Sequence, residues 1–291
     1  MKLLGWALGL LALGAPAAHA DDACIKGGKH AENVGLSTTA TAFCFEKGTC
    51  YSAELATGRI TVGKPAGSDL PELAEAPDAP KLTNGTADIT VCHHDGSQCK
   101  KLATEHDIDP GIGFVSAVTA SGTLAAIGVQ GAPFFVDVFD VGSGKRTSTF
   151  KLPSGGGLCG FLAFAGDTLD VTQTECGSSK GKEWLASTSG KTIGRIGGAS
   201  PIMTGGPPVH VTDDVWAFAP DGGDVVILQN VVTGKVMKRL SVAKAEPDSP
   251  ATLVGDSAHL VLVYGGARAG DLAVIDVATG KVTKFPAKRC S

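Results

Sequence analysis

Apolar and polar residues alternate in short runs along this chain, and turns containing glycine interrupt the runs at regular places. Near the C-terminal end, such runs cover Ala251–Val254, His259–Tyr264, Asp271–Val277 and Lys281–Phe285. Alternating runs of about four to eight residues, bounded by Gly, Asp or Ser, are typical of half-buried β-strands. The pattern therefore predicts four short antiparallel strands in this part of the chain.

The same succession of four runs occurs in two earlier parts of the chain. One set is Phe114–Thr119, Leu124–Val129, Phe134–Phe139 and Arg146–Leu152, and the other is Leu158–Ala165, Leu169–Glu175, Glu183–Ser187 and Lys191–Ile196. No run has the period of an amphipathic helix, so the pattern predicts an all-β chain built from repeated four-stranded units.

A short turn with glycine stands before the last strand of each unit. The six turn glycines are Gly58, Gly96, Gly144, Gly190, Gly234 and Gly280, and they are spaced by 38, 48, 46, 44 and 46 residues. A period in the forties indicates a repeat architecture, and four antiparallel strands make one propeller blade. We therefore predict a six-bladed β-propeller with four disulfides in a single domain, residues 21–291. Seven blades is the alternative, because the shortest spacing, 38 residues, fits seven times into that length.

Three segments carry a family resemblance. Residues 139–152 (FDVGSGKRTSTFKL), 228–240 (LQNVVTGKVMKRL) and 274–285 (VIDVATGKVTKF) resemble the repeats of the YVTN and WD40-like β-propeller superfamily, of the secreted bacterial type. The resemblance is weaker over residues 24–36 and 67–86. It implies that the glycine turns share one face of a wheel. The second-to-third strand loops and the connections between blades would then share the opposite face, where proteins of this family bind partners.

The first twenty residues have the pattern of a secretory signal peptide. Lys2 is followed by an apolar segment, Leu3–Leu13, and by Ala18-His19-Ala20, a small-residue cleavage signal. The apolar segment is shorter than the roughly 20 residues that a membrane span needs. We expect residues 1–20 to be removed after Ala20, and the mature protein to be periplasmic or extracellular, without a membrane anchor.

The eight cysteines all follow the predicted signal peptide, and in an oxidising compartment an even number predicts four disulfides. Cys92 and Cys99 flank Asp95-Gly96 symmetrically, as partners across a hairpin would. By the same symmetry Cys44 pairs with Cys50, and Cys159 with Cys176, which leaves Cys24 and Cys290 at the two ends. By chain entropy the terminal bond is worth about 5–6 kcal/mol and each short hairpin bond about 2.4 kcal/mol.

The sequence offers little catalytic chemistry. Lys and Arg number 25 and Asp and Glu 29, a net charge of −4, which does not suggest a nucleic-acid-binding protein. His106, Asp107 and Asp109 lie close together in the connection to the third unit, where they could hold a divalent cation or act in acid–base catalysis; a solvated polar loop is the favoured interpretation. We therefore predict no catalytic residue, metal or cofactor. The expected function is a scaffold that binds a protein, peptide or glycan, and the alternative is a hydrolase or lyase with its active site at the mouth of the central channel.

Overall fold

A computed structural model shows how the predicted runs are arranged. It describes residues 23–29, 31–45, 49–63, 80–93, 95–119, 121–152, 157–177, 181–196, 208–220, 223–242 and 250–290. The expected signal peptide, residues 1–20, lies outside these ranges. Within them the chain forms β-strands joined by turns, loops and one short 3₁₀ turn, Gly266–Arg268.

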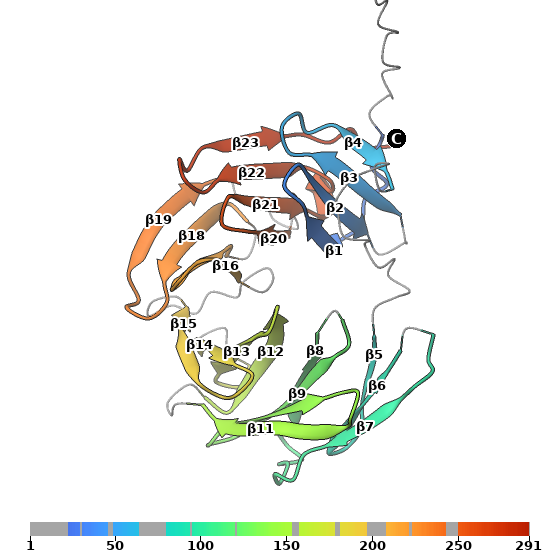
Figure 1. The fold of residues 1–291 in the computed structure, drawn as a ribbon, viewed down its shortest axis with the longest axis vertical. Helices are drawn as coiled ribbons and strands as arrows, with labels where there is room; N and C mark the ends of the chain where they lie inside the picture. Colours follow the sequence, from blue (N-terminus) through green and yellow to red (C-terminus); the bar gives the residue numbers. More distant parts are fainter. Residues whose placement is uncertain are drawn as a thin grey trace, which may run out of the picture.

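The strands form six antiparallel sheets, each made from one continuous part of the chain (Figure 1). In chain order, the strands are β1 (Ala31–Leu36), β2 (Ala40–Phe45), β3 (Cys50–Glu54) and β4 (Ile60–Val62) in sheet 1; β5 (Lys81–Asn84), β6 (Asp88–Cys92) and β7 (Lys100–Ala103) in sheet 2; β8 (Phe114–Val118), β9 (Leu124–Val129), β10 (Phe135–Asp140) and β11 (Lys145–Lys151) in sheet 3; β12 (Cys159–Ala165), β13 (Thr168–Thr174), β14 (Gly181–Ser187) and β15 (Thr192–Ile196) in sheet 4; β16 (Val209–Thr212), β17 (Val215–Phe218), β18 (Val225–Asn230) and β19 (Val236–Ser241) in sheet 5; and β20 (Ala251–Gly255), β21 (His259–Tyr264), β22 (Leu272–Asp276) and β23 (Val282–Phe285) in sheet 6.

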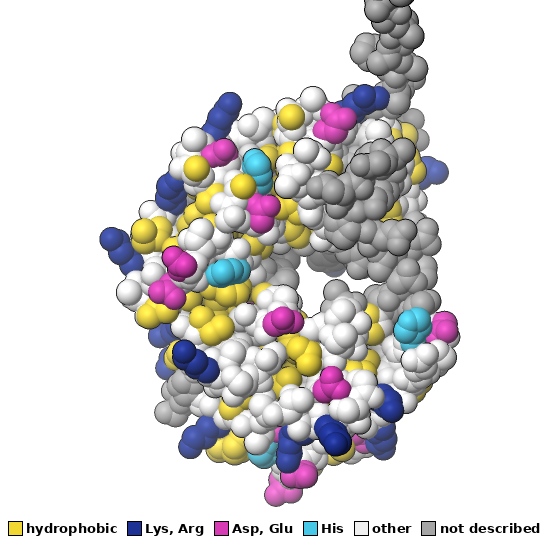
Figure 2. Space-filling model, viewed as in Figure 1, with side chains coloured by type: hydrophobic (Ala, Val, Ile, Leu, Met, Phe, Trp, Pro, Cys, Tyr) yellow, Lys and Arg dark blue, Asp and Glu magenta, His cyan; other side chains and the backbone are white. Residues whose placement is uncertain are grey.

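The sheets follow one another around a central opening, which the space-filling view shows as a hollow in the middle of the ring (Figures 1 and 2). In sheet 6, successive side chains of β21 and β22 are almost all buried, because both faces of the sheet are covered by neighbouring sheets. Apolar clusters fill the spaces between sheets 2 and 3, 3 and 4, 4 and 5, 5 and 6, and 6 and 1. This arrangement defines a fold of the β-propeller class.

Sheet 2 has three described strands where the sequence predicted four. Gly122, in the turn after β8, lies against Pro80, which precedes β5, and the Ser116 hydroxyl on β8 donates to Asn84 Oδ1 at the end of β5 (2.7 Å). β5 therefore runs antiparallel to β8, which is the first strand of sheet 3. Because β5 has the opposite direction to a first strand, it corresponds to the second strand of a four-stranded unit. The expected first strand would fall within residues 64–79, which lie outside the described residues.

The six turn glycines adopt the backbone conformation that the repeat requires. Their φ angles are 71°, 84°, 70°, 85°, 73° and 74° in chain order, a region that L-residues with side chains rarely occupy. At three turns, a polar side chain four residues earlier accepts a backbone N–H: Asp140 from Ser143, Asn230 from Thr233, and Asp276 from Thr279. At these turns the polar side chain therefore helps to fix the loop that the glycine ends.

The outermost strand of one sheet meets the glycine turn of the next sheet. Phe150 of β11 covers Gly190, Leu240 of β19 covers Gly280, and Phe285 of β23 covers Gly58. A Cβ atom placed on Gly190 would lie 2.6 Å from the Phe150 ring. The contact between sheets 6 and 1 thus repeats the contact that joins successive sheets inside the chain.

The N-terminal segment completes the junction between sheets 6 and 1. Ile25 forms a parallel bridge with Arg289, and its side chain, 1% exposed, packs in the cluster that contains Leu272 and Val274 of sheet 6 and Phe43 of sheet 1. The structure contains four disulfides, Cys24–Cys290, Cys44–Cys50, Cys92–Cys99 and Cys159–Cys176, and these are the four pairs that the sequence predicts. The first of them joins the two ends of the described chain.

The terminal disulfide should contribute more to stability than a hairpin disulfide. It closes a loop of 266 residues, whereas Cys92–Cys99 closes one of seven, and the chain entropy lost by the unfolded state rises with loop length. We expect Cys290→Ser to lower the melting temperature more than Cys99→Ser in calorimetry of the oxidised proteins. Equal losses would show that the terminal bond does not hold the ring closed.

The Phe285–Gly58 contact can be measured against a turn that lacks such a neighbour. Gly58 and Gly144 have φ angles of 71° and 70°, but a Cβ on Gly144 would meet no atom within 4 Å. Gly144→Ala should therefore cost only the backbone strain, about 1–2 kcal/mol. Gly58→Ala should cost about 1–3 kcal/mol more, because the new methyl group displaces the Phe285 ring. Urea denaturation measures both, and identical losses would argue against the contact.

Candidate functional site

Two ends of the sheets differ in the elements that they carry. One end, which we call the turn face, carries the first-to-second strand turns and the glycine turns. The other, the connection face, carries the second-to-third strand loops and the connections between sheets. Hydrogen bonds tie its elements together: Gln130 Nε2 donates to Ile112 O (2.9 Å), Gln130 Oε1 accepts from Gly160 N (2.8 Å), and Gly265 N donates to Pro250 O (2.8 Å).

Three of the four disulfides brace the connection face. Cys44–Cys50 spans the loop between β2 and β3, and Cys159–Cys176 joins the start of β12 to the residues that follow β13. Cys24–Cys290 joins the segment before β1 to the segment after β23. The fourth bond, Cys92–Cys99, lies in the β6–β7 hairpin on the turn face.

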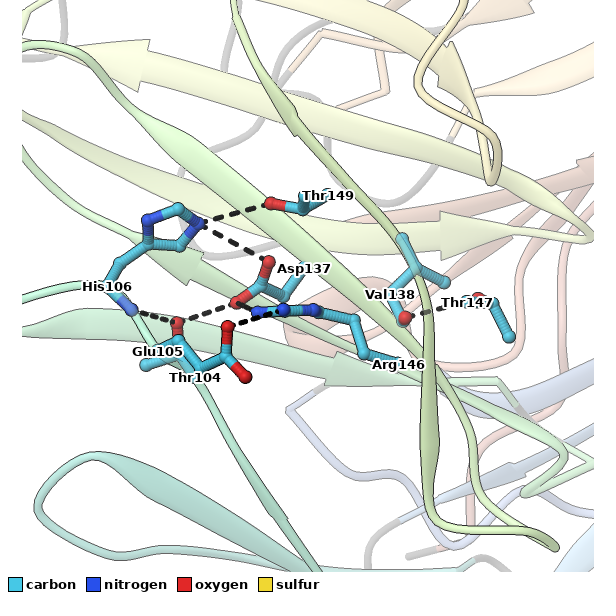
Figure 3. A network of polar contacts seen from close by, with 8 residues as sticks. All are labelled: Thr104, Glu105, His106, Asp137, Val138, Arg146, Thr147 and Thr149. Atoms are coloured by element: carbon cyan, nitrogen blue, oxygen red, sulfur yellow. Dashed lines mark hydrogen bonds and ion pairs between the residues drawn. The ribbon is translucent and has the colours of Figure 1, made fainter.

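His106, predicted as a site residue, lies in the connection from β7 to β8 and packs on sheet 3 (Figure 3). Its ring stacks on Phe135 with centroids 4.1 Å apart and planes at 10°. Its Nε2 atom lies 3.1 Å from Thr149 Oγ1 on β11 and 3.5 Å from Asp137 Oδ1 on β10. His106 thus joins the end of sheet 2 to the two outer strands of sheet 3.

The centre of this network is the buried carboxylate of Asp137, which is 0% exposed. Its Oδ2 atom accepts a hydrogen bond from the Thr104 hydroxyl (2.6 Å) and lies 3.7 Å from Arg146 Nη1. Arg146 Nη2 also contacts Glu105 Oε2 at 2.6 Å, and the hydrogen bond to Glu105 together with the charge of Asp137 raises the pKa of Arg146. The Thr104 hydrogen bond and the neighbouring Arg146 cation offset part of the cost of burying this carboxylate, whose Oδ1 atom has no hydrogen-bond partner among the described residues.

The network does not have the geometry of a catalytic relay. A general base in such a relay contacts the carboxylate with one ring nitrogen and the nucleophile with the other. Here Asp137 and Thr149 both lie against the same atom, His106 Nε2. The arrangement therefore supports a polar tie between sheets 2 and 3 that holds the connection in place.

The other two residues of the predicted cluster do not join His106. Asp109 is exposed and its Oδ1 accepts the backbone N–H of Gly111 (2.8 Å), which shapes the turn before β8. Asp107 is also exposed. Across the described ranges, no group of three or more His, Cys, Asp and Glu side chains could hold a metal ion. Sequence reasoning missed Asp137, although an acidic residue between Val136 and Val138 in an apolar strand was a signal for it.

A pair of carboxyl groups is buried on the side of sheet 4 that faces sheet 5. Asp170 on β13 and Glu183 on β14 share a hydrogen bond, while Asp170 Oδ1 and Glu183 Oε1 have no partner among the described residues. They lie on the same side of the sheet as Leu185 and Ile196, which pack against Trp216 of sheet 5. Burial raises the pKa of both carboxyl groups, and for Glu183 the charge of Asp170 raises it further. Such a pair is stable when it keeps a proton.

The central opening offers few ionisable groups. On the innermost described strand of each sheet, the described ionisable side chains are Lys81 of β5 and His210 of β16, which belong to different sheets. The His210 ring packs on Trp216, and its Nε2 lies 2.9 Å from Asp213 O. These described groups do not supply the three converging polar side chains that we would expect of an active site at this place.

The known structures that resemble this chain do so at low sequence identity. No protein-family model matches it, and no curated protein does. Similar solved structures are BamB from Moraxella catarrhalis (14% identity, TM-score 0.42, 72% of this chain and 65% of that one), the WD40 β-propeller domain of Doa1 (12%, 0.44, 72% and 66%) and a chain of the mitotic checkpoint complex (16%, 0.47, 73% and 64%). The match spans less than two thirds of the length of each.

Two further findings bear on where the protein works. Its four disulfides fit an oxidising compartment, because cytosolic thiols are kept reduced. In the part of the chain that the structure describes, no helix has the length and apolarity to cross a bilayer.

The buried pair predicts a characteristic pH dependence of stability. A carboxyl group whose pKa is raised by folding binds more protons in the folded than in the unfolded state, so stability falls as pH rises above the ordinary carboxyl value of about 4 and through the raised value. Glu183→Gln should flatten this fall between about pH 5 and pH 8 in urea denaturation. Asp107→Asn, at an exposed site, should leave the slope unchanged. An unchanged slope in Glu183→Gln would contradict the assignment.

Proposed function

We propose that this chain is an exported binding scaffold, a single six-bladed β-propeller formed by residues 21–291 after removal of residues 1–20. In this proposal, each of the six sheets is one blade of a wheel of the YVTN and WD40-like type. The protein resides in the periplasm or outside the cell, and its connection face holds a partner protein, a peptide or a glycan.

The observation that supports the proposal is the bracing of the connection face. Three disulfides, the Gln130 hydrogen bonds and the His106–Asp137 network hold loops that would otherwise be mobile. A surface that is already ordered loses less conformational entropy when it binds, which increases affinity. The bracing favours binding over hydrolase or lyase activity, and so does the small number of ionisable side chains among the described residues of the innermost strands.

Site-directed photocrosslinking in cells that produce the full chain tests this role. A photoreactive amino acid replaces Glu175 or Ala267, which are exposed on the connection face, or Ser143 or Thr233, which are exposed on the turn face. We expect a discrete adduct from the first two positions and none from the second two, with the attached molecule identified by mass spectrometry. Adducts from the turn face alone, or from no position, would contradict the proposal.

A further inference from the structure

Basic residues are concentrated on the outermost strands of the six sheets. These strands, with the residue that follows the turn glycine, cover residues 59–62, 100–103, 145–151, 191–196, 235–241 and 281–285. They contain thirteen of the 25 Lys and Arg residues of the chain and none of its 29 Asp and Glu residues. In a chain with a net charge of −4, the charged residues of the outermost strands are therefore all basic. Figure 2 shows the dark blue side chains around the edge of the ring.

Most of these cations are exposed and form no ion pair within the described residues. Two cations of the outer strands form ion pairs within the described residues. Lys101 pairs with Asp88 (3.1 Å), and Arg146 pairs with Glu105 and Asp137. Eight others are exposed and have no ion pair within the described residues: Lys100, Lys145, Lys151, Lys191, Lys235, Arg239, Lys281 and Lys284. Their charges remain available to an external anion.

Four of the outer strands, β11, β15, β19 and β23, each contact the glycine turn of the following sheet, so that they form one continuous belt. Ser148 of β11 donates a hydrogen bond to Thr188 O, and Arg195 N of β15 donates to Val231 O (3.0 Å). Lys238 Nζ of β19 lies 3.3 Å from both Val277 O and Ala278 O. Each acceptor belongs to the turn that precedes the outer strand of the following sheet, as Gly58 does beneath Phe285. The exposed cations therefore follow the circumference, and Lys235, Arg239, Lys281 and Lys284 lie on one arc of it.

Protection of sheet edges explains only part of this pattern. Charged side chains on an edge strand prevent it from pairing with another chain, and lysine is the residue most often used. Edge protection requires charge on each exposed edge, but it does not by itself require that every outer strand exclude acidic residues. The single sign of charge on the outer strands points to an anionic ligand.

We propose that this belt binds an anionic polysaccharide, a flexible polymer that can follow the curved perimeter. A flat anionic membrane would touch only a short arc of the belt, and the turn face beside it carries Asp95, Asp140 and Asp276. Single-stranded nucleic acid is bound on exposed aromatic rings, whereas the aromatic residues of the described outer strands, Phe150 and Phe285, lie against the turn glycines. Carboxylates or sulfates along a sugar chain match the spaced lysines without requiring a stacking surface.

Binding of the mature protein to heparin, used as a probe polysaccharide, tests the proposal. Isothermal titration at low and moderate salt should show an affinity that decreases with salt. The variant Lys235→Glu/Arg239→Glu/Lys281→Glu/Lys284→Glu should bind about tenfold or more weakly, because four belt cations are reversed. The control Lys26→Glu/Lys29→Glu/Lys182→Glu/Lys288→Glu changes the net charge equally away from the belt and should lose little affinity.

Three results would overturn the proposal. The first is that heparin does not bind the native protein at moderate salt. The second is that the two quadruple variants lose affinity equally. The third is that vesicles with anionic lipid, or a single-stranded oligonucleotide, bind more tightly than heparin. A second belt variant, with glutamine at the same four positions, separates lost binding from a lost fold. If it remains folded and monomeric in sedimentation and yet binds heparin as the native protein does, the belt serves edge protection alone.

Discussion

The structure depends on how, at three of its junctions, the outermost strand of one sheet meets the glycine turn of the next one. A turn glycine has no side chain and adopts a positive φ, so a large residue from the preceding sheet can lie directly on its backbone. Phe150 on Gly190 and Leu240 on Gly280 make this contact within the chain, and Phe285 on Gly58 makes it between the last and first sheets. This local contact therefore joins three pairs of neighbouring sheets, including the last and the first.

The two faces and the perimeter of the ring have different physical properties as a result. The connection face is braced by covalent bonds and by polar ties such as His106–Asp137, where a buried charge is paired with donors from two sheets. The perimeter carries exposed lysines on the outermost strands of the sheets. The space between sheets 4 and 5 contains the protonated pair Asp170–Glu183, whose burial costs stability at high pH. The braced connection face, the charged belt and the buried carboxyl pair thus occupy separate parts of the molecule.

Features that depend on neighbours in sequence could be predicted, and features that depend on how sheets pack could not. The six glycine turns and the pairing of Cys44 with Cys50 follow from symmetry about a hairpin, which the sequence shows directly. Asp137 and His106 belong to different sheets, so their contact depends on a rotation between sheets that no local pattern reveals. Asp107 and Asp109 are near His106 in sequence, but the connection turns their side chains toward solvent. Residues 67–86 resemble the repeat only weakly, so the sequence does not locate the first strand of the second unit.

The bond between Cys24 and Cys290 also determines how the molecule carries mechanical load. The two Cα atoms are 5.0 Å apart, although the two cysteines are separated by 266 positions in the sequence. Tension applied at the two ends passes through a single covalent bond and bypasses every hydrogen bond of the six sheets. Under an oxidising environment the folded ring is therefore shielded from pulling, and reduction of one bond transfers the whole force to the noncovalent junction between sheets 6 and 1.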